Sequence, residues 1–136
     1  MKNILLLVSF IFFQIVAFAQ MDKTLSLCDQ NIIPPFVSDG QEYRALLNEG
    51  ELAEFNVVFY GGSLYRISAC SGETNGNLIF SVYDQERNLL FTNRDNENSP
   101  YWDFKINSTV KLIIEAELGD DVSNSGFAFI QIGFKQ

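Results

Sequence analysis

Two segments in the second half of the chain alternate apolar and polar residues with a period of two. In YWDFKINS, the side chains of Trp102, Phe104 and Ile106 fall on one face, and mostly polar residues fall on the other. In VKLIIEAEL, residues 110–118, an apolar face again opposes a face that carries Lys and Glu. This period belongs to β-strands with one face in a core and one face in water. The alternation therefore predicts antiparallel sheets, because such sheets can expose one face to solvent.

Short runs of β-forming residues recur along the chain, and each break between them contains Gly, Asn, Asp, Ser or Pro, which favour turns. The expected strands are residues 43–48, 52–60, 64–70, 78–84, 89–93, 101–107, 110–118 and 126–134. A helix over residues 43–52 is the alternative for the first, because Leu46 and Leu47 are good helix formers. About eight strands in one small domain predict an all-β fold, an antiparallel two-sheet β-sandwich of jelly-roll type.

The pattern also predicts which parts of these strands are buried. The last expected strand, residues 126–134, is apolar on both faces. It needs cover on both sides, so we expect it at the centre of a sheet. The single tryptophan, Trp102, alternates with Phe104 and Ile106 and is therefore expected in the core.

The N-terminus has the composition of a secretory signal peptide. Lys2 gives a positive start, residues 4–13 are mostly apolar, and Ala17-Phe18-Ala19 fits a signal-peptidase site. The apolar run is shorter than the roughly 20 residues of a membrane span, so we expect cleavage and no membrane span in the mature chain. The alternatives are an uncleaved anchor and a lipid attached to Cys28, which follows the loosely lipobox-like Leu25-Ser26-Leu27.

Cleavage divides the chain into a signal peptide (residues 1–19), an N-terminal arm (residues 20–40) and a β-sandwich domain (residues 41–136). The expected location is secreted or periplasmic. The net charge is −8, and the loss of Lys2 makes it one unit more negative. Because a nucleic-acid surface needs clustered Lys and Arg, nucleic acid is not an expected partner.

The two cysteines, Cys28 and Cys70, are expected to form a disulfide because export places them in an oxidising compartment. The bridge would tie the proline-containing arm to a strand of the sandwich. A pair of buried free thiols is the alternative.

Several local patterns from Glu49 onward occur together. A strand contains Phe55 and Phe59, the turn Gly61-Gly62 follows, and the hairpin of residues 78–90 comes next. This order resembles the bacterial pre-peptidase C-terminal (PPC) type of domain and, more distantly, the Golgi-dynamics (GOLD) type. The resemblance covers residues 49–134. It implies a small β-sandwich with an extracytoplasmic accessory or binding role and no site to transfer. The hairpin departs from the family in having Arg87-Asn88 where Asp-Gly or Asn-Gly is usual.

The composition excludes several classes of enzyme. The chain has no histidine, which removes Ser-His-Asp catalysis, Cys-His catalysis and His-ligated zinc. A carboxylate pair of the glycosidase kind remains, but among 17 acidic residues some pair is inevitable. We therefore expect no enzyme activity.

A polar loop is the candidate metal site. Asn93, Asp95 and Glu97 alternate within it, and calcium prefers such oxygen ligands. A solvated acidic loop without metal is the alternative. No other cofactor is expected.

Three tyrosines are out of phase with their core-facing neighbours and are candidates for an exposed binding surface: Tyr60, Tyr83 and Tyr101. The leading hypothesis is a non-catalytic binding module that contacts a protein or a carbohydrate partner. The alternatives are a structural subunit of a cell-envelope assembly and a small carboxylate-dependent hydrolase. A groove lined by Tyr would favour glycan binding, whereas a flat apolar patch would favour assembly.

Overall fold

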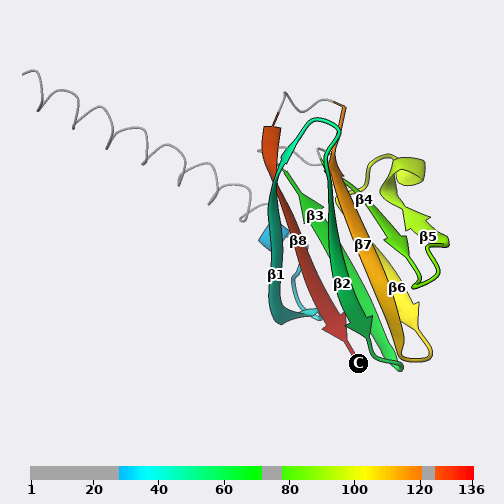
Figure 1. The fold of residues 1–136 in the computed structure, drawn as a ribbon. Coiled ribbons are helices and arrows are strands. Elements are labelled where there is room, and N and C mark those ends of the chain that lie inside the picture. The colour runs from blue at the N-terminus through cyan, green and yellow to red at the C-terminus, as the bar shows by residue number, and fades with distance from the viewer. Residues whose placement is uncertain (1–27, 72–77, 121–124) are drawn as a thin grey trace, which may run out of the picture.

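A computed structural model describes residues 28–71, 78–120 and 125–136. The predicted signal peptide and its cleavage site lie outside these residues. The described chain forms eight β-strands and one short 3-10 helix, η1 (Figure 1). The bounds are β1 (Val37–Asn48), β2 (Leu52–Phe59), β3 (Ser63–Cys70), β4 (Leu78–Tyr83), β5 (Leu89–Thr92), η1 (Asn93–Asn96), β6 (Tyr101–Ile106), β7 (Val110–Leu118) and β8 (Ser125–Lys135). No helix within the described ranges is long and apolar enough to cross a membrane.

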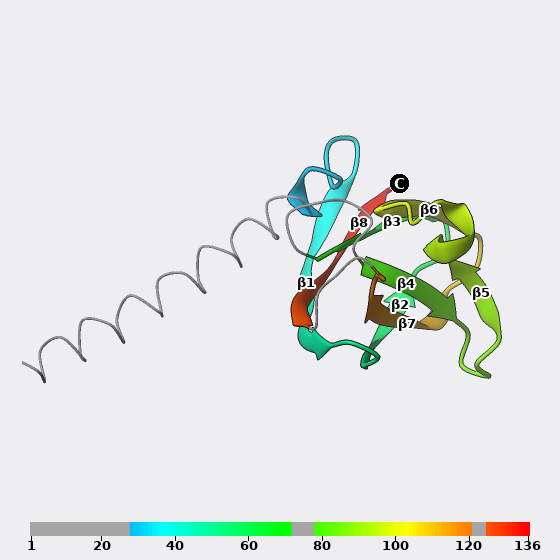
Figure 2. The same cartoon turned by 90° about the horizontal axis from the view of Figure 1, so that it is seen from above.

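The strands form two four-stranded antiparallel sheets that lie face to face (Figure 2). Sheet A has the order β1-β8-β3-β6, and sheet B has the order β2-β7-β4-β5. The strands pair as in one long hairpin, β1 with β8, β2 with β7, β3 with β6 and β4 with β5. The chain changes sheet at every connection except that between β4 and β5. This arrangement is a jelly roll, so the predicted fold class is confirmed.

Strand β1 begins at Val37, before its predicted start at residue 43. The last residues of the region assigned to the arm therefore belong to the sandwich. The register of β1 against β8 shifts between Ser38 and Glu42, which marks a bulge. Gly40 in this bulge has a φ of 80°, which glycine adopts without strain. The sequence around Gly40 resembles that of a turn, although this glycine lies within strand β1.

The core fills the space between the two sheets. The largest fully buried side chains of its main cluster are Phe59, Phe80, Ile67, Leu78, Ile114, Ile130 and Ile132. Aromatic contacts join the sheets, because the ring of Phe59 in β2 stacks on that of Tyr65 in β3 with centroids 4.1 Å apart. Burial of these apolar side chains is the main favourable term in the folding of such a domain.

The N-terminal arm covers part of the outer face of sheet A. The predicted disulfide is present and joins Cys28 of the arm to Cys70 of β3, with Phe129 of β8 packed against it. Farther along β8, Gly133 lies under the arm, where an added Cβ atom would stand 2.9 Å from a methyl carbon of Ile32. Strand β8 lies between β1 and β3, so the prediction of a central, doubly covered strand is confirmed.

The prediction that Trp102 is in the core is wrong, because 38% of its surface is exposed. The indole stacks on Phe91 of β5, with the ring centroids 5.1 Å apart. However, β5 and β6 are both edge strands, so no further strand shields this contact from solvent. Alternation indicates which face of a strand a side chain is on, but not whether that strand lies at a sheet edge.

The hairpin between β4 and β5 is held together by polar contacts. The carboxylate of Asp84 accepts hydrogen bonds from the backbone and side-chain nitrogens of Asn88. The side-chain bond from Asn88 is the main cause of the lowered pKa of Asp84. Arg87, with a φ of 64°, forms ion pairs with Glu115 of the neighbouring strand β7 and with Glu54 of β2 beyond it. The hairpin is therefore part of the framework.

Candidate functional site

A groove of about 590 Å³ opens at the side of the sandwich where the edge strands β1 and β2 lie. Asp39 and Tyr43 of β1 form one wall, and Asn56 of β2 with Tyr60 just beyond it forms the other. Phe134 of β8 contributes from sheet A. The groove therefore combines aromatic rings, amides and one carboxylate, the mixture typical of a binding site.

Asp39 lies in the bulge of β1, and its Oδ1 accepts a hydrogen bond of 2.8 Å from the backbone amide of Gln41. Burial raises the pKa of Asp39, and the Gln41 amide opposes this rise in part. Among the described residues, no Lys or Arg lines the groove. Within the described residues Asp39 forms no ion pair.

Two tyrosines are on opposite walls of the groove. The hydroxyl of Tyr43 donates a hydrogen bond to the side-chain oxygen of Gln41. Burial and, second, the nearby charge of Asp39 raise the pKa of Tyr43. Tyr60 is 63% exposed, while its backbone amide donates a 3.0 Å hydrogen bond to the hydroxyl of Tyr65. The backbone at Tyr60 is thus anchored, and its ring is left accessible.

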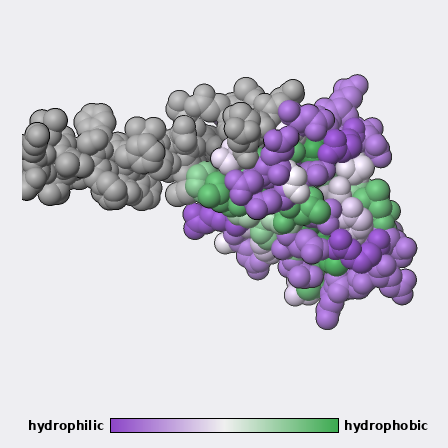
Figure 3. Space-filling view, turned by 45° about the horizontal axis from the view of Figure 1, so that its top comes forward, coloured by the Kyte–Doolittle hydropathy of each residue, from purple (hydrophilic) through white to green (hydrophobic). Residues whose placement is uncertain are grey.

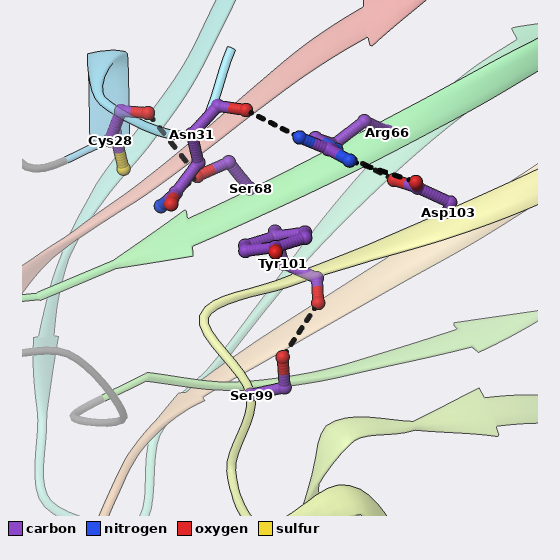
Figure 4. A network of polar contacts seen from close by, with 7 residues as sticks. All are labelled: Cys28, Asn31, Arg66, Ser68, Ser99, Tyr101 and Asp103. Atoms are coloured by element: carbon purple, nitrogen blue, oxygen red, sulfur yellow. Dashed lines mark hydrogen bonds and ion pairs between the residues drawn. The ribbon is translucent and has the colours of Figure 1, made fainter. Parts of the chain in front are cut away.

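A polar cluster on the outer face of sheet A fixes the arm to the strands (Figure 4). Arg66 of β3 donates hydrogen bonds of 2.6 and 2.8 Å to the two carboxylate oxygens of Asp103 in β6, and one of 3.1 Å to the carbonyl of Asn31. Its guanidinium carbon lies 4.1 Å from the ring centre of Phe36 and 4.4 Å from that of Tyr101. The hydrogen bonds to Asp103 are the main cause of the raised pKa of Arg66.

Next to this cluster is a shallower hollow of about 360 Å³, lined by Ser99, Tyr101, Trp102 and Asp103. The exposed fractions of Tyr101 and Trp102 are 37% and 38%. The two rings are on opposite faces of strand β6, but because β6 is an edge strand both line the same hollow. Exposed rings beside polar groups are suited to contact with a sugar or with a protein surface.

The structure does not bring the three predicted binding tyrosines together. Tyr60 is at the groove, and Tyr101 is in the hollow on β6. Tyr83 is on sheet B, where the guanidinium of Arg87 lies 5.0 Å from its ring centre. One side of the Tyr83 ring is therefore occupied by this chain.

The predicted calcium ligands are in and beside η1. Asn93 is fully buried, and its amide nitrogen donates to the carbonyls of Leu78 and Ser99. Its side-chain oxygen accepts a bond from the Phe80 amide. Within the described residues no group of three or more His, Cys, Asp or Glu is placed to hold a metal ion. Asn93 thus has a structural role, and a calcium site in this loop stays a prediction.

Sequence reasoning missed Asp39 and Gln41 as site residues. Asp39 lies at the end of the predicted arm and Gln41 at the start of the predicted sandwich domain, both ahead of the first expected strand, and the Ser-Asp-Gly-Gln sequence is typical of a turn. The detectable signal was a carboxylate next to a glycine directly before an expected strand, a combination that also fits a β-bulge.

The surface as a whole is mixed. Figure 3 shows one face, on which apolar residues form small groups separated by polar residues. Exposed large apolar side chains of the described chain include Leu46, Leu52, Leu89 and Leu90.

Comparisons with known proteins support the fold. No protein-family model matches the chain, and no curated protein matches it in sequence. The resemblance to PPC-type and GOLD-type domains therefore stays a prediction. Among solved structures, the crystal structure of Aeromonas hydrophila PliG, a periplasmic lysozyme inhibitor of g-type lysozyme, is similar with a TM-score of 0.54 and 9% sequence identity. The match covers 76% of this chain and 90% of PliG. This chain therefore shares its sandwich architecture with PliG.

Proposed function

We propose that this chain is an exported, non-catalytic module that binds another protein. The observation that carries the proposal is the groove between β1 and β2, which presents exposed aromatic surface and a carboxylate. PliG, a protein of similar fold, is described as an inhibitor of a lysozyme, so this fold can support recognition of a protein. The disulfide between Cys28 and Cys70 is in keeping with an oxidising, extracytoplasmic location.

The net charge of the chain favours a basic partner, because complementary charge speeds association and disfavours wrong partners. A lysozyme is the first partner to test. Isothermal titration of residues 20–136 against a g-type lysozyme and lysozymes of other types should give saturable binding to at least one of them. An unrelated acidic protein of similar size, titrated in place of this chain, is the control for non-specific attraction. Titration at elevated salt is a second control.

Inhibition of peptidoglycan lysis by the same lysozyme would connect binding to a role. If no lysozyme binds, affinity capture from an extracytoplasmic extract tests other proteins. Absence of saturable binding to any protein in both experiments would contradict the proposed function.

A carbohydrate partner is the second candidate, and the hollow at Tyr101 and Trp102 favours it. Sugars stack on exposed aromatic rings, and the Asp103 carboxylate and Ser99 hydroxyl are neighbouring hydrogen-bonding groups. Binding on a glycan array that is lost in Trp102→Ala, and kept in Tyr60→Ala, would support this candidate. Equal signals from both variants and the parent would exclude the hollow as a glycan site.

A further inference from the structure

The bulge in β1 brings a carboxylate to the side of the groove. Opposite Asp39, Gly40 and Gln41 on β1, strand β8 has only Ile132 between the paired residues Gly133 and Gln131. Bulges change the direction of side chains and often occur near functional sites. The bulge thus explains how the side chains of Asp39 and Gln41, although they are on an edge strand, come to line the groove.

The carboxylate of Asp39 lacks a compensating cation in the described chain. Its one hydrogen bond there comes from the neutral amide of Gln41. Among the described residues that line the groove, Asp39 has the one charged side chain, and the other side chains are neutral. Burial accordingly raises the pKa of Asp39. A cation that enters the groove would offset the cost of burying this charge.

The aromatic rings of the groove complete a cation-binding arrangement. Tyr43 of β1 and Tyr60 just beyond β2 are on its two walls, and Phe134 of β8 also lines it. The faces of aromatic rings attract cations, and the guanidinium of arginine stacks on such rings more often than the lysine ammonium does. The amide of Asn56 adds a neutral hydrogen-bonding group at the same place.

The same chemical groups already bind an arginine elsewhere in this protein. Arg66 lies between the rings of Phe36 and Tyr101 and shares two hydrogen bonds with Asp103. That site contains two rings, a carboxylate and a guanidinium, and all four groups come from this chain. Figure 4 shows Arg66, Tyr101 and Asp103 of this site. In the groove the rings and the carboxylate are present without the guanidinium.

We propose that the groove between β1 and β2 binds an arginine side chain of the partner protein, with Asp39 as its ion-pair acceptor and Tyr43 and Tyr60 as its aromatic walls. The inference rests on the proposed function and specifies the chemistry of the contact. The groove volume of about 590 Å³ accommodates such a side chain together with neighbouring backbone. The acidic net charge of the chain matches an arginine-bearing surface.

The test uses the isolated protein, residues 20–136, and therefore does not depend on the identity of the partner. The probes are two capped tripeptides, acetyl-Gly-Arg-Gly-amide and acetyl-Gly-citrulline-Gly-amide, which differ in charge and hardly in shape. Two-dimensional NMR follows the backbone amides of Gln41, Tyr43 and Tyr60 during titration. The arginine peptide should shift these signals saturably, and the citrulline peptide should bind about tenfold more weakly or not at all.

Two variants assign the effect to the groove. Asp39→Asn keeps an oxygen for the Gln41 amide but removes the charge, and Tyr60→Ala removes an exposed ring. Each should weaken arginine-peptide binding about tenfold, because each removes a charged or aromatic contact. Asp95→Asn, which removes an exposed charge in η1, is the matched control and should leave binding unchanged. Dispersed spectra of all variants confirm that they fold.

Each other outcome overturns the proposal. Shifts outside the groove, equal response to both peptides, or unchanged binding by Asp39→Asn would exclude an arginine contact at Asp39. A stronger response to choline than to the arginine peptide would identify a site for a small quaternary cation instead. Failure of the proposed function gives a different pattern, because the groove would bind the arginine peptide while no protein binds the chain.

Discussion

Arg66 and Asp103 face each other on neighbouring strands of sheet A and share two hydrogen bonds. The same guanidinium also donates to the carbonyl of Asn31 in the arm. One residue therefore connects β3, the edge strand β6 and the N-terminal arm. Only 16% of the Arg66 side chain is exposed, so its loss would leave partly buried polar groups without their partner.

Replacing Arg66 by Ala should lower the free energy of unfolding by about 2 kcal/mol, because a two-bond ion pair and two ring contacts are lost together. Urea unfolding of the two proteins measures the difference. Lys111→Ala, at an exposed position of β7, is the matched control. A loss at Arg66 no larger than that at Lys111 would show that the cluster does not stabilise the fold.

Loss of the bridge between Cys28 and Cys70 should destabilise the domain by about 4 kcal/mol, as expected when a loop of this length is no longer closed in the unfolded chain. The comparison is between the parent and a Cys28→Ser, Cys70→Ser double variant in the same buffer. Thiol titration of the unfolded, unreduced parent should find no free thiol. Two reactive thiols there would mean that the bridge does not form in the exported protein.

The buried side-chain amide of Asn93 forms hydrogen bonds with several backbone groups where β5 ends. Asn93→Ala should cost about 3 kcal/mol, because it leaves the Phe80 amide and the Leu78 carbonyl unpaired in the interior. Asn93→Asp should also destabilise, since a carboxylate cannot donate to a carbonyl. Asn107→Ala, at an exposed position, is the control, and thermal unfolding compares all three variants.

The raised pKa of Asp39 predicts how folding stability depends on pH. In the folded state its proton is held more tightly than in the unfolded state, so folding stability falls as pH rises from the ordinary value of 3.8 through the raised folded value. Asp39→Asn should therefore be more stable than the parent at pH 7, and the difference should shrink at pH 3. Denaturant unfolding at both pH values tests this. If Asp39→Asn is less stable than the parent at pH 7, the charge of Asp39 does not destabilise the fold.

The fluorescence of Trp102 measures how accessible the edge of the sandwich is to solvent. Acrylamide should quench its fluorescence in the native protein, because 38% of the residue is exposed. Phe91→Ala removes the ring on which the indole stacks and should increase the quenching constant. Quenching that appears only after unfolding would contradict the observed exposure.

Most strands could be predicted from the sequence because their hydrophobic pattern follows the pleat of a sheet with one core face. Strand β7, for example, extends over Val110–Leu118, as the alternation predicts. The start of β1 was missed because Gly40 permits a bulge within a strand as readily as a turn between strands.

The candidate site was harder to predict than the fold. Tyr60 was identified because it is out of phase with core residues, but Asp39 lies outside the alternating pattern. Trp102 was misplaced because its exposure depends on which strands form the sheet edges. Such properties depend on the pairing of distant strands, and a local pattern does not contain them.

The position of β8 has a consequence for the order in which the protein opens. Its amide groups have paired neighbours along both edges, β1 and β3, and the arm lies over Gly133. Exchange of these hydrogens for deuterium therefore requires the release of β1 or β3, both of which are far from β8 in the sequence. The slowest-exchanging amides of β8 should measure the stability of the whole domain, whereas those of β5 should exchange through local fraying.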